Sequence, residues 1–465
     1  MNASSTHDKA LRINLDAARY GTFAEIGAGQ EVARWFFIVG GAAGTVAKTI
    51  SAYDMDVSDA VYGAARRYVS RQRLQAMIEH EWELLVQRLD ASRGASTRFF
   101  VFADTVAAKS FSRKEEGHGW LGVRFQTAPR AEPSEILVHA RMWDLENARQ
   151  QEALGILGVN LLHGAFFDSA NAAALIGSLM DNLTRDRMEV DMIKFSGPAF
   201  AGVDNRIMSL NLVQQRLTNA VLFSPDGDVL EPAELLHGAS VLIERGSFRP
   251  VTTVTEDMLT RSLEHMSREP DMRGRDPVVL MEMTVRNLAS LGEQVVYADF
   301  LARVDVLRTL GRTVMVTNYS RFYNVTTYLR RYTAERIGLV VGVPTLARML
   351  EERHYEDLAG GLLEALGQLL AGPVTIYVYP WRNPATGEVV SVANFAVPQH
   401  LGHLYAYLRE NGFIEALETP PDIDLSVMPQ RVLALIQADD PAWERLVPPE
   451  VIGVIKEKRL FGLSA

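Results

Sequence analysis

Between Ala153 and Trp381, short apolar runs alternate with segments of helical spacing. Glycine, proline or polar residues bound each run, which is typical of strands buried on both faces of a parallel sheet. The runs read ALGILGVNLL, VDMIKF, NAVLF, SVLIERG, VVLMEMTV, TVMVTN, GLVVGV and VTIYVYP. The helical segments between them suit the crossover connections that parallel strands need. The pattern therefore predicts an α/β protein with an open, mostly parallel, Rossmann-like sheet.

Eight such runs would also suit a closed (β/α)8 barrel, which is the alternative architecture. Two features favour the open sheet. The connection between NAVLF and SVLIERG carries only a brief helical piece, EPAELLHG. After VTIYVYPW, the turn RNPATG leads into EVVSVANF, and this pattern is typical of an antiparallel hairpin at a sheet edge.

The first third of the chain has a different character. A long amphipathic helix or helix pair is predicted from Ser58 to about Leu89, and three strand-like segments follow it, TRFFVFADTVAAK, GWLGVRFQT and EILVHARMWD. Short connections between these segments favour an antiparallel meander. We expect an α+β domain over residues 1–150, the α/β domain over 151–415, and a C-terminal tail packing on the body over 416–465.

Composition excludes several classes of function. The chain has 465 residues and no cysteine, so disulfides, thiolate metal sites and a cysteine nucleophile are excluded. A net charge of −10 argues against non-specific nucleic-acid binding. No apolar run approaches the roughly 20 residues of a membrane span, and the opening residues lack the pattern of a signal peptide. These features predict a cytoplasmic protein that does not enter a membrane.

Two glycine clusters lie near the N-terminus, each ahead of a run that could form a helix. Glycine at such a position lets backbone N–H groups approach an anion at a helix N-terminus. The candidate phosphate-binding residues are Gly27, Gly29, Gly41, Gly44, Thr45 and Lys48. The first cluster lacks the third glycine of a dinucleotide fingerprint, and Lys48 does not directly follow Gly44 as a P-loop requires. The alternative is that small residues allow close packing of two elements.

The same stretch carries a family resemblance. YGTFAEIGAGQEVARWFF, followed by GGAAGTVAKTISAYDM, resembles over roughly residues 20–63 the opening of a family of soluble bacterial proteins often labelled "TonB-dependent receptor". The resemblance implies no established activity and no functional residues. The label itself conflicts with the chain, which has no series of about 10-residue barrel strands.

Charged and polar residues gather just after the predicted strands, where α/β sheets bind ligands. The candidate catalytic residues are His163, Lys194, Glu244 and Glu282. The candidate substrate-binding residues are Asn205, Arg206, Arg245, Arg249, Arg286, Asn318 and Arg321. Arginine binds carboxylate or phosphate through two parallel hydrogen bonds, and a buried carboxyl group or a histidine can transfer protons. Structural ion pairs between these arginines and glutamates are the alternative.

The function that this pattern favours is an enzyme acting on a small anionic, phosphorylated or nucleotide-like substrate. No H-E-x-x-H, G-x-S-x-G or paired metal-ligand motif is present, so no metal site is predicted and the cofactor stays open. His118 and His139 are the other notable histidines, and structural roles are expected for them. The alternative function is a non-catalytic homo-oligomeric assembly or scaffold, with the segment around WFF as a subunit contact.

Overall fold

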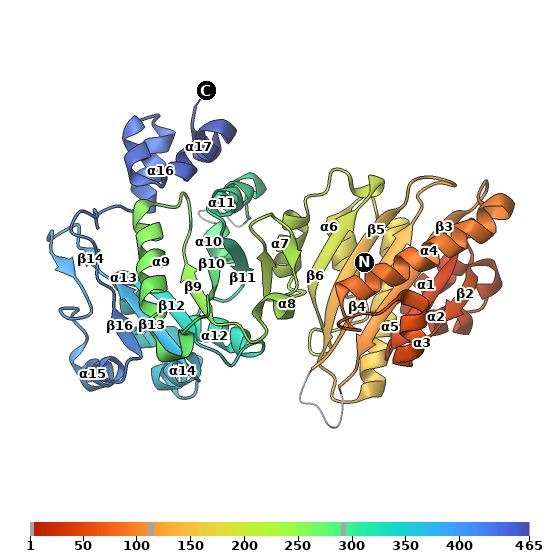
Figure 1. The fold of residues 1–465 in the computed structure, drawn as a ribbon, viewed down its shortest axis with the longest axis horizontal. Coiled ribbons are helices and arrows are strands. Elements are labelled where there is room, and N and C mark those ends of the chain that lie inside the picture. The colour runs from red at the N-terminus through yellow and green to blue at the C-terminus, as the bar shows by residue number, and fades with distance from the viewer. Residues whose placement is uncertain (1–3, 110–115, 290–293, 465) are drawn as a thin grey trace. The chain divides into compact units, whose positions relative to one another are not determined.

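The computed structural model describes residues 4–109, 116–289 and 294–464. The chain divides into two compact units, Met1–Val221 and Leu222–Ala465. Each unit has its own open sheet with helices, so the protein is α/β as expected (Figure 1, red to yellow-green for the first unit and green to blue for the second). The expected boundary near residue 150 falls inside the first unit.

The first unit contains a six-stranded mixed sheet with strand order β2-β1-β3-β4-β5-β6. Its strands are β1 (Arg19–Gly27), β2 (Val46–Ile50), β3 (Arg98–Ala107), β4 (Gly117–Phe125), β5 (Ser134–Met142) and β6 (Met188–Ser196). β2, β1 and β3 are parallel, and β3 to β6 pair antiparallel in succession. The predicted antiparallel meander over β3, β4 and β5 is therefore confirmed.

Helices cover both faces of this sheet. They are α1 (Thr6–Asn14), α2 (Val32–Ile38), α3 (Met55–Tyr62), α4 (Arg71–Arg93), α5 (Asn147–Phe167), α6 (Ala172–Ser178) and α7 (Asn205–Gln214). Phe99 and Val101 pack on Leu85 of α4, whereas the Phe100 ring lies 5.1 Å from that of Phe166 on α5. Because successive strand residues face opposite sides, α4 and α5 cover opposite faces.

The run ALGILGVNLL, predicted as the first strand of the parallel sheet, lies inside α5, so that prediction was wrong. All residues from Ala153 to Phe166 are buried, because α1, α2, α6 and the sheet surround this helix. A helix that is buried all round shows no amphipathic period, and its apolar run cannot be told from a buried strand by pattern alone.

Two further expectations for the first unit need correction. The run VDMIKF forms β6, but β6 pairs antiparallel with β5 in the first sheet instead of entering the parallel sheet. The second glycine cluster leads through a single 3-10 turn, Ala42–Gly44, into strand β2, and not into an α-helix. β-branched residues in VAKTI favour a strand, and β2 pairs in parallel with β1.

The second unit contains an eight-stranded sheet with order β16-β13-β12-β9-β10-β11-β7-β8. Its strands are β7 (Ala220–Phe223), β8 (Val229–Leu230), β9 (Val241–Arg245), β10 (Val278–Thr284), β11 (Thr313–Thr317), β12 (Ile337–Gly342), β13 (Val374–Tyr379) and β16 (Ile414–Ala416). Neighbours from β16 through to β11 are parallel, and β7 and β8 are antiparallel. The predicted open, mostly parallel sheet is confirmed, and the barrel alternative is wrong.

The helices of this unit are α8 (Pro232–Leu236), α9 (Thr253–Met266), α10 (Val285–Leu288), α11 (Tyr297–Thr309), α12 (Phe322–Arg330), α13 (Val343–Met349), α14 (Gly361–Leu369), α15 (Gly402–Glu410), α16 (Pro429–Gln437) and α17 (Pro449–Lys458). β14 (Trp381–Arg382) and β15 (Val389–Val390) form the expected hairpin as a separate two-stranded sheet. Lys458 of α17 pairs with Asp305 of α11. Over the described ranges, no helix has the length and apolar character needed to cross a membrane.

The strand order locates where a ligand is expected. β9 leads through α9 to β10 on one side, while its other neighbour, β12, leads to β13 in the opposite direction. Ligands of open α/β sheets bind beyond the carboxyl ends of the strands at such a reversal. The ends of β9 and of its neighbours are therefore where the site should lie.

Arg330 fixes the C-terminal end of α12 to the amino edge of this sheet. Its Nε donates to the carbonyl of Ala371 (3.1 Å) and its Nη2 to that of Pro373 (3.0 Å). Its Nη1 donates to the carbonyls of Thr333 (3.3 Å) and Glu335 (2.5 Å). One guanidinium thus joins the end of α12 to the chain segments that lead into β12 and β13.

Candidate functional site

An ion pair and a hydrogen bond join three neighbouring strand ends of the second unit. Arg245 on β9 and Glu282 on β10 are partners in register. Arg245 Nε donates to Glu282 Oε2 (2.6 Å) and Nη2 donates to Oε1 (2.7 Å), which is the bidentate geometry of a strong charge-assisted pair. The hydroxyl of Thr317, at the end of β11, donates to Glu282 Oε1 (2.6 Å). Glu282 is fully buried and its carboxylate is thereby satisfied.

Arg245 also holds the loop between β11 and α12. Its Nη1 donates to the carbonyl of Ser320 (3.3 Å), and its guanidinium lies 4.3 Å from the centre of the Phe322 ring. Arg321, the residue before α12, makes no side-chain hydrogen bond to the first turn of the helix. The first-turn N–H groups and the helix dipole therefore face the carboxyl edge without a side-chain cap, an arrangement that favours an anion.

Two arginines at this edge remain available. The guanidinium of half-buried Arg321 lies 5.5 Å from the ring of Tyr355, and Arg286 is exposed after β10. Neither has an ion pair within residues 4–109, 116–289 and 294–464. Asn318 is exposed in the same β11–α12 loop. The structure thus brings Arg245, Glu282, Asn318 and Arg321 together from the sequence-predicted set, and it places Arg286 at the end of the strand beside them.

Arg249, a candidate substrate-binding residue, pairs with a carboxylate of the chain. Its Nε lies 2.5 Å from Asp299 Oδ1, and Arg303 also pairs with Asp299. Arg303 is buried and donates to the carbonyls of Ser247 and Asn287 (3.2 Å each). These bonds tie the loops after β9 and β10 to α11. Sequence reasoning missed Arg303, although an arginine four residues after an aspartate on a buried helix face was a usable signal.

Glu244 faces away from this cluster. It precedes Arg245 on β9, and adjacent strand residues point to opposite faces of a sheet. The carboxyl group is buried beside Glu256 of α9, which itself pairs with Arg312 (2.9 Å). Burial raises the pKa of Glu244, Glu256 raises it further, and Arg312 lowers it. The carboxyl groups of Glu244 and Glu282 therefore lie on opposite faces of the sheet and cannot contact the same ligand.

The remaining predicted catalytic and substrate-binding residues belong to the first unit. His163 lies on α5, where burial and the charge of Lys9 lower its pKa to about 4. Lys194 lies within β6. The Asn205 side chain bonds the backbone N–H (2.7 Å) and carbonyl (3.0 Å) of Phe195, and Arg206 pairs with Asp204. Each of these bonds is local and stabilises the first unit.

The six candidate phosphate-binding residues do not form one loop. Gly27 ends β1, whereas Thr45 bonds Gly21 near the start of that strand. At about 3.3 Å per residue, six residues separate the two groups by roughly 20 Å. Gly41 and Gly44 lie on the Thr45 side. Lys48, on β2, pairs with Glu81 of α4.

A carboxylate of the chain occupies the position where the first glycine cluster would hold an anion. Glu25 Oε1 accepts from the N–H of Val32 (2.8 Å) and Oε2 from that of Ala33 (3.3 Å), at the start of α2. Its neighbour in register, Asp104 on β3, is fully buried. A Cβ on Gly29 would lie 2.0 Å from Asp104 Oδ1. The glycine therefore makes room for a carboxyl pair.

This carboxyl pair retains protons more strongly than exposed carboxyl groups do. Burial raises the pKa of Glu25 to about 7, although the N–H groups of Val32 and Ala33 oppose the increase. Burial also raises the pKa of Asp104, and the nearby Glu25 raises it further. Charged residues inside the apolar runs YGTFAEIG and FFVFADTV were the signal for this pair, but a single sequence does not show that they are neighbours.

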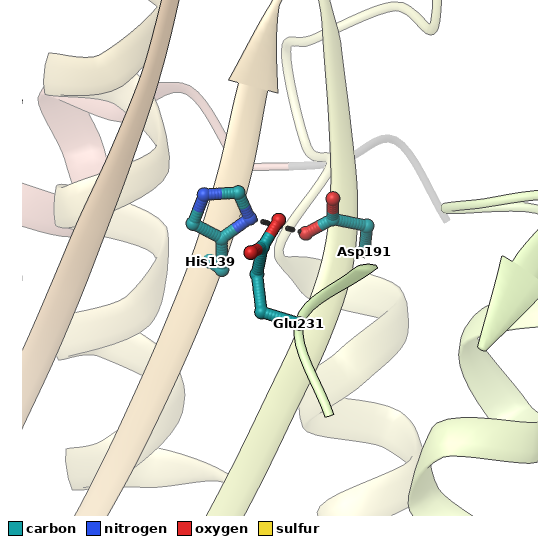
Figure 2. A group of neighbouring side chains, drawn as sticks. All are labelled: His139, Asp191 and Glu231. Atoms are coloured by element: carbon teal, nitrogen blue, oxygen red, sulfur yellow. Dashed lines mark hydrogen bonds and ion pairs between the residues drawn. The ribbon is translucent and has the colours of Figure 1, made fainter. Parts of the chain in front are cut away.

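A second buried network of the first unit joins two histidines to an ion pair. His139 Nδ1 lies 2.5 Å from Asp191 Oδ1 (Figure 2), and Arg141 Nε donates to Asp191 Oδ2 (2.8 Å). On its other side, His139 Nε2 lies 3.1 Å from His118 Nδ1. Glu231, also drawn in Figure 2, belongs to the second unit, where it caps α8.

The charges of this network shift the pKa values of its members. Burial by itself raises the pKa of Asp191, but His139 and Arg141 outweigh burial and the net pKa is lowered. Burial, His139 and Arg141 together lower the pKa of His118 to about 3. The sequence singled out both histidines and expected structural roles for them, whereas Asp191 was hidden inside the run VDMIKF.

Comparison with known proteins gives partial structural similarity. No family model and no curated protein matches the chain, so the resemblance of residues 20–63 stays an expectation. Competence/damage inducible protein CihA from Agrobacterium tumefaciens is 18% identical and covers 35% of this chain and 96% of its own, with a TM-score of 0.27. A competence-damaged protein (CinA) superfamily protein from Klebsiella pneumoniae is 17% identical over 35% of this chain and 95% of its own, with a TM-score of 0.25. These values do not assign a function.

Proposed function

We propose that the second unit binds a small anionic, phosphorylated or nucleotide-like substrate at the carboxyl ends of β9, β10 and β11, and that the protein is an enzyme acting on it. The observation that carries the proposal is the uncapped N-terminus of α12. Arg245 holds it in place, and Arg321, which has no ion pair with a described residue, lies beside it. Arg321 directly precedes the first-turn N–H groups, and a guanidinium and backbone N–H groups are both donors that bind phosphate oxygens.

Each residue has a distinct role in this proposal. Arg321, Arg286 and the first-turn N–H groups of α12 contact the anionic group. Arg245 is a positioning residue, because both of its charge-assisted bonds go to Glu282 and its third bond fixes Ser320. Glu282 in turn orients Arg245. The exposed side chain of Asn318 provides an amide donor and acceptor for the uncharged part of the substrate.

The test is a thermal-shift and calorimetric titration with inorganic phosphate, nucleoside mono- and diphosphates, and sugar phosphates. A ligand present at about 100 times its Kd should stabilise the protein by about 2.7 kcal/mol. Arg321→Ala should weaken binding at least about tenfold, since hydrogen bonds to charged groups contribute roughly 1.5–3 kcal/mol. Its melting temperature should stay near that of the wild type, because Arg321 makes no ion pair with any described residue.

Arg445→Ala is the matched control, because Arg445 is an exposed arginine of the same unit outside this cluster. It should change neither affinity nor stability. The proposal is overturned if no phosphorylated compound stabilises the wild type, or if Arg321→Ala and Arg286→Ala bind as tightly as the control. Turnover of the bound compound is then measured directly, and complete absence of turnover with tight binding would leave a binding protein instead of an enzyme.

A second candidate function rests on the surface of the first unit. Large apolar side chains are exposed within residues 15–57, namely Leu15, Phe37, Ile38, Tyr53, Met55 and Val57. Exposed apolar residues in such number are typical of interaction surfaces. They favour a homo-oligomeric assembly through the WFF segment. Light scattering across a hundredfold range of protein concentration measures the mass, and a constant monomer mass would exclude this candidate.

A further inference from the structure

A cavity of about 410 Å³ lies in the second unit beside the edge strand β16. Its volume falls within the roughly 300–1,000 Å³ that small-molecule sites occupy. One side is lined by residues from the end of α9 onward, namely Arg261, Glu264, His265 and Arg268. The other side is lined by residues 416–420, which begin with the last residue of β16. None of these residues belongs to the Arg245 cluster.

The wall of this cavity is held rigidly. His265 Nε2 lies 2.5 Å from Glu415 Oε2 on β16, and its ring lies 5.4 Å from that of Tyr377. Arg261 donates to Asp257 (3.2 Å) and to Glu264 (2.8 Å). The contact between His265 and Glu415 joins α9 to the sheet edge, whereas the two Arg261 bonds lie within α9. A wall held in this way reduces the entropy that is lost when a ligand binds.

One cation and one carboxylate on the two sides are left for a ligand. Arg268 is exposed, and its guanidinium has no hydrogen bond or ion pair to any residue in the described ranges. Glu418 is exposed on the opposite side and likewise has no ion pair in the part of the chain that the structure describes. The other charged side chains of the wall, Arg261, Glu264 and His265, are already paired.

We infer that this cavity binds a small zwitterion, a molecule of amino-acid type with one carboxylate and one ammonium group. A guanidinium binds a carboxylate through two parallel hydrogen bonds, so Arg268 receives the carboxylate. Glu418 receives the ammonium group. Glu264 and Glu418 are carboxylates of the cavity wall, and their negative charge would repel a polyphosphate. A polyphosphate is better suited to the uncapped helix end beside Arg321. The side chain of the ligand rests on Ala416 and Leu417.

The test is calorimetric titration of the full-length protein with each of the twenty amino acids, with succinate and with inorganic phosphate. At least one amino acid should bind the wild type. Arg268→Ala and Glu418→Gln should each weaken its binding at least about tenfold, as loss of a charge-assisted hydrogen bond does. Both residues are exposed, so the melting temperatures should equal that of the wild type.

Arg321→Ala is the control that separates this site from the proposed function. It should leave amino-acid binding unchanged, and Arg268→Ala should leave binding of phosphorylated compounds unchanged. The inference is overturned if no amino acid binds at millimolar concentration or if Arg268→Ala binds normally. It is also overturned if succinate or phosphate binds as tightly as the amino acid and Glu418→Gln has no effect, since the cavity would then recognise an anion alone.

Discussion

The two units place their buried charges differently. In the first unit, Glu25, Asp104, His139 and Asp191 lie within strands and face partners on neighbouring strands. In the second unit, the ion pair of Arg245 and Glu282 lies at strand ends and fixes a loop whose Arg321 has no ion pair with a described residue. The Asp191 carboxylate is satisfied by His139 and Arg141 on the neighbouring strand, whereas burial raises the pKa values of Glu25 and Asp104. A cation that has no ion pair with a described residue and lies beside a helix N-terminus is suited to a ligand. The difference favours a structural role for the first set and supports the binding role that we propose for the second.

The largest effect that sharpens this comparison is expected from Asp191→Ala. The change leaves Arg141 and His139 buried without their carboxylate, and removing one partner of a buried pair typically costs about 3–5 kcal/mol. Chemical denaturation measures the free energy of unfolding. Asp90→Ala, which breaks the exposed pair with Arg130, should cost no more than about 1 kcal/mol. Equal costs for the two variants would contradict the structural role of the buried network.

The carboxyl pair predicts how stability depends on pH. The folded-state pKa of Glu25, about 7, lies above its ordinary value of 4.5. Folding therefore incurs no penalty below pH 4.5, and stability is lost as the pH rises through 7. Burial and the nearby Glu25 raise the pKa of Asp104. Asp104→Asn removes this carboxyl group, so it should stabilise the protein at pH 8 and have a smaller effect at pH 5.

The measurement is unfolding at several pH values from 5 to 8, with Asp90→Asn as an exposed carboxylate control. The control should shift the whole pH profile slightly and leave its slope unchanged. If Asp104→Asn keeps the wild-type slope, Glu25 and Asp104 do not share protons in the folded state.

The smallest effects come from the two glycine clusters. An alanine at Gly29 would place Cβ 2.0 Å from Asp104 Oδ1 and 2.6 Å from its Cγ, and overpacking of this kind typically costs about 1–3 kcal/mol. An alanine at Gly44 meets only the Asn14 carbonyl, at 4.0 Å, so its effect should be within about 0.5 kcal/mol. The melting temperatures of both variants test whether Gly29→Ala loses more stability than Gly44→Ala. A larger loss for Gly44→Ala would contradict this prediction.

Much of the second sheet could be predicted from the sequence. Strands β7 and β9 to β13 form where short apolar runs were found, because a strand buried on both faces needs an unbroken apolar run. The same logic failed for ALGILGVNLL, since a helix buried on all sides has the same requirement. Strand order and the pairing of Val190 to Phe195 with β5 depend on long-range contacts that a local pattern does not contain.

The sequence predicted that polar residues would gather at the carboxyl ends of these strands, but it did not predict how they pair. Residues after β9, β10 and β11 converge as the carboxyl-edge rule predicts. Which of them are paired depends on side-chain direction and register. Arg245 pairs with Glu282 because the two are in register on one face, whereas Glu244, one residue earlier, lies on the other face. His163 and Lys194 entered the candidate set only because α5 and β6 were placed in the wrong sheet.

Arg330 has a mechanical consequence for α12. Its four bonds to backbone carbonyls anchor one end of this helix to the amino edge of the sheet, while the other end contacts Arg245 through Phe322. These bonds favour rotation of α12 about its C-terminal end over translation of the whole helix. Any shift of Ser320 to Phe322 when an anion binds should therefore rotate α12 about Arg330 and displace α14, which packs on it. Binding of an anion at the carboxyl edge would in this way be coupled to movement of α12 and α14 on the face of the sheet.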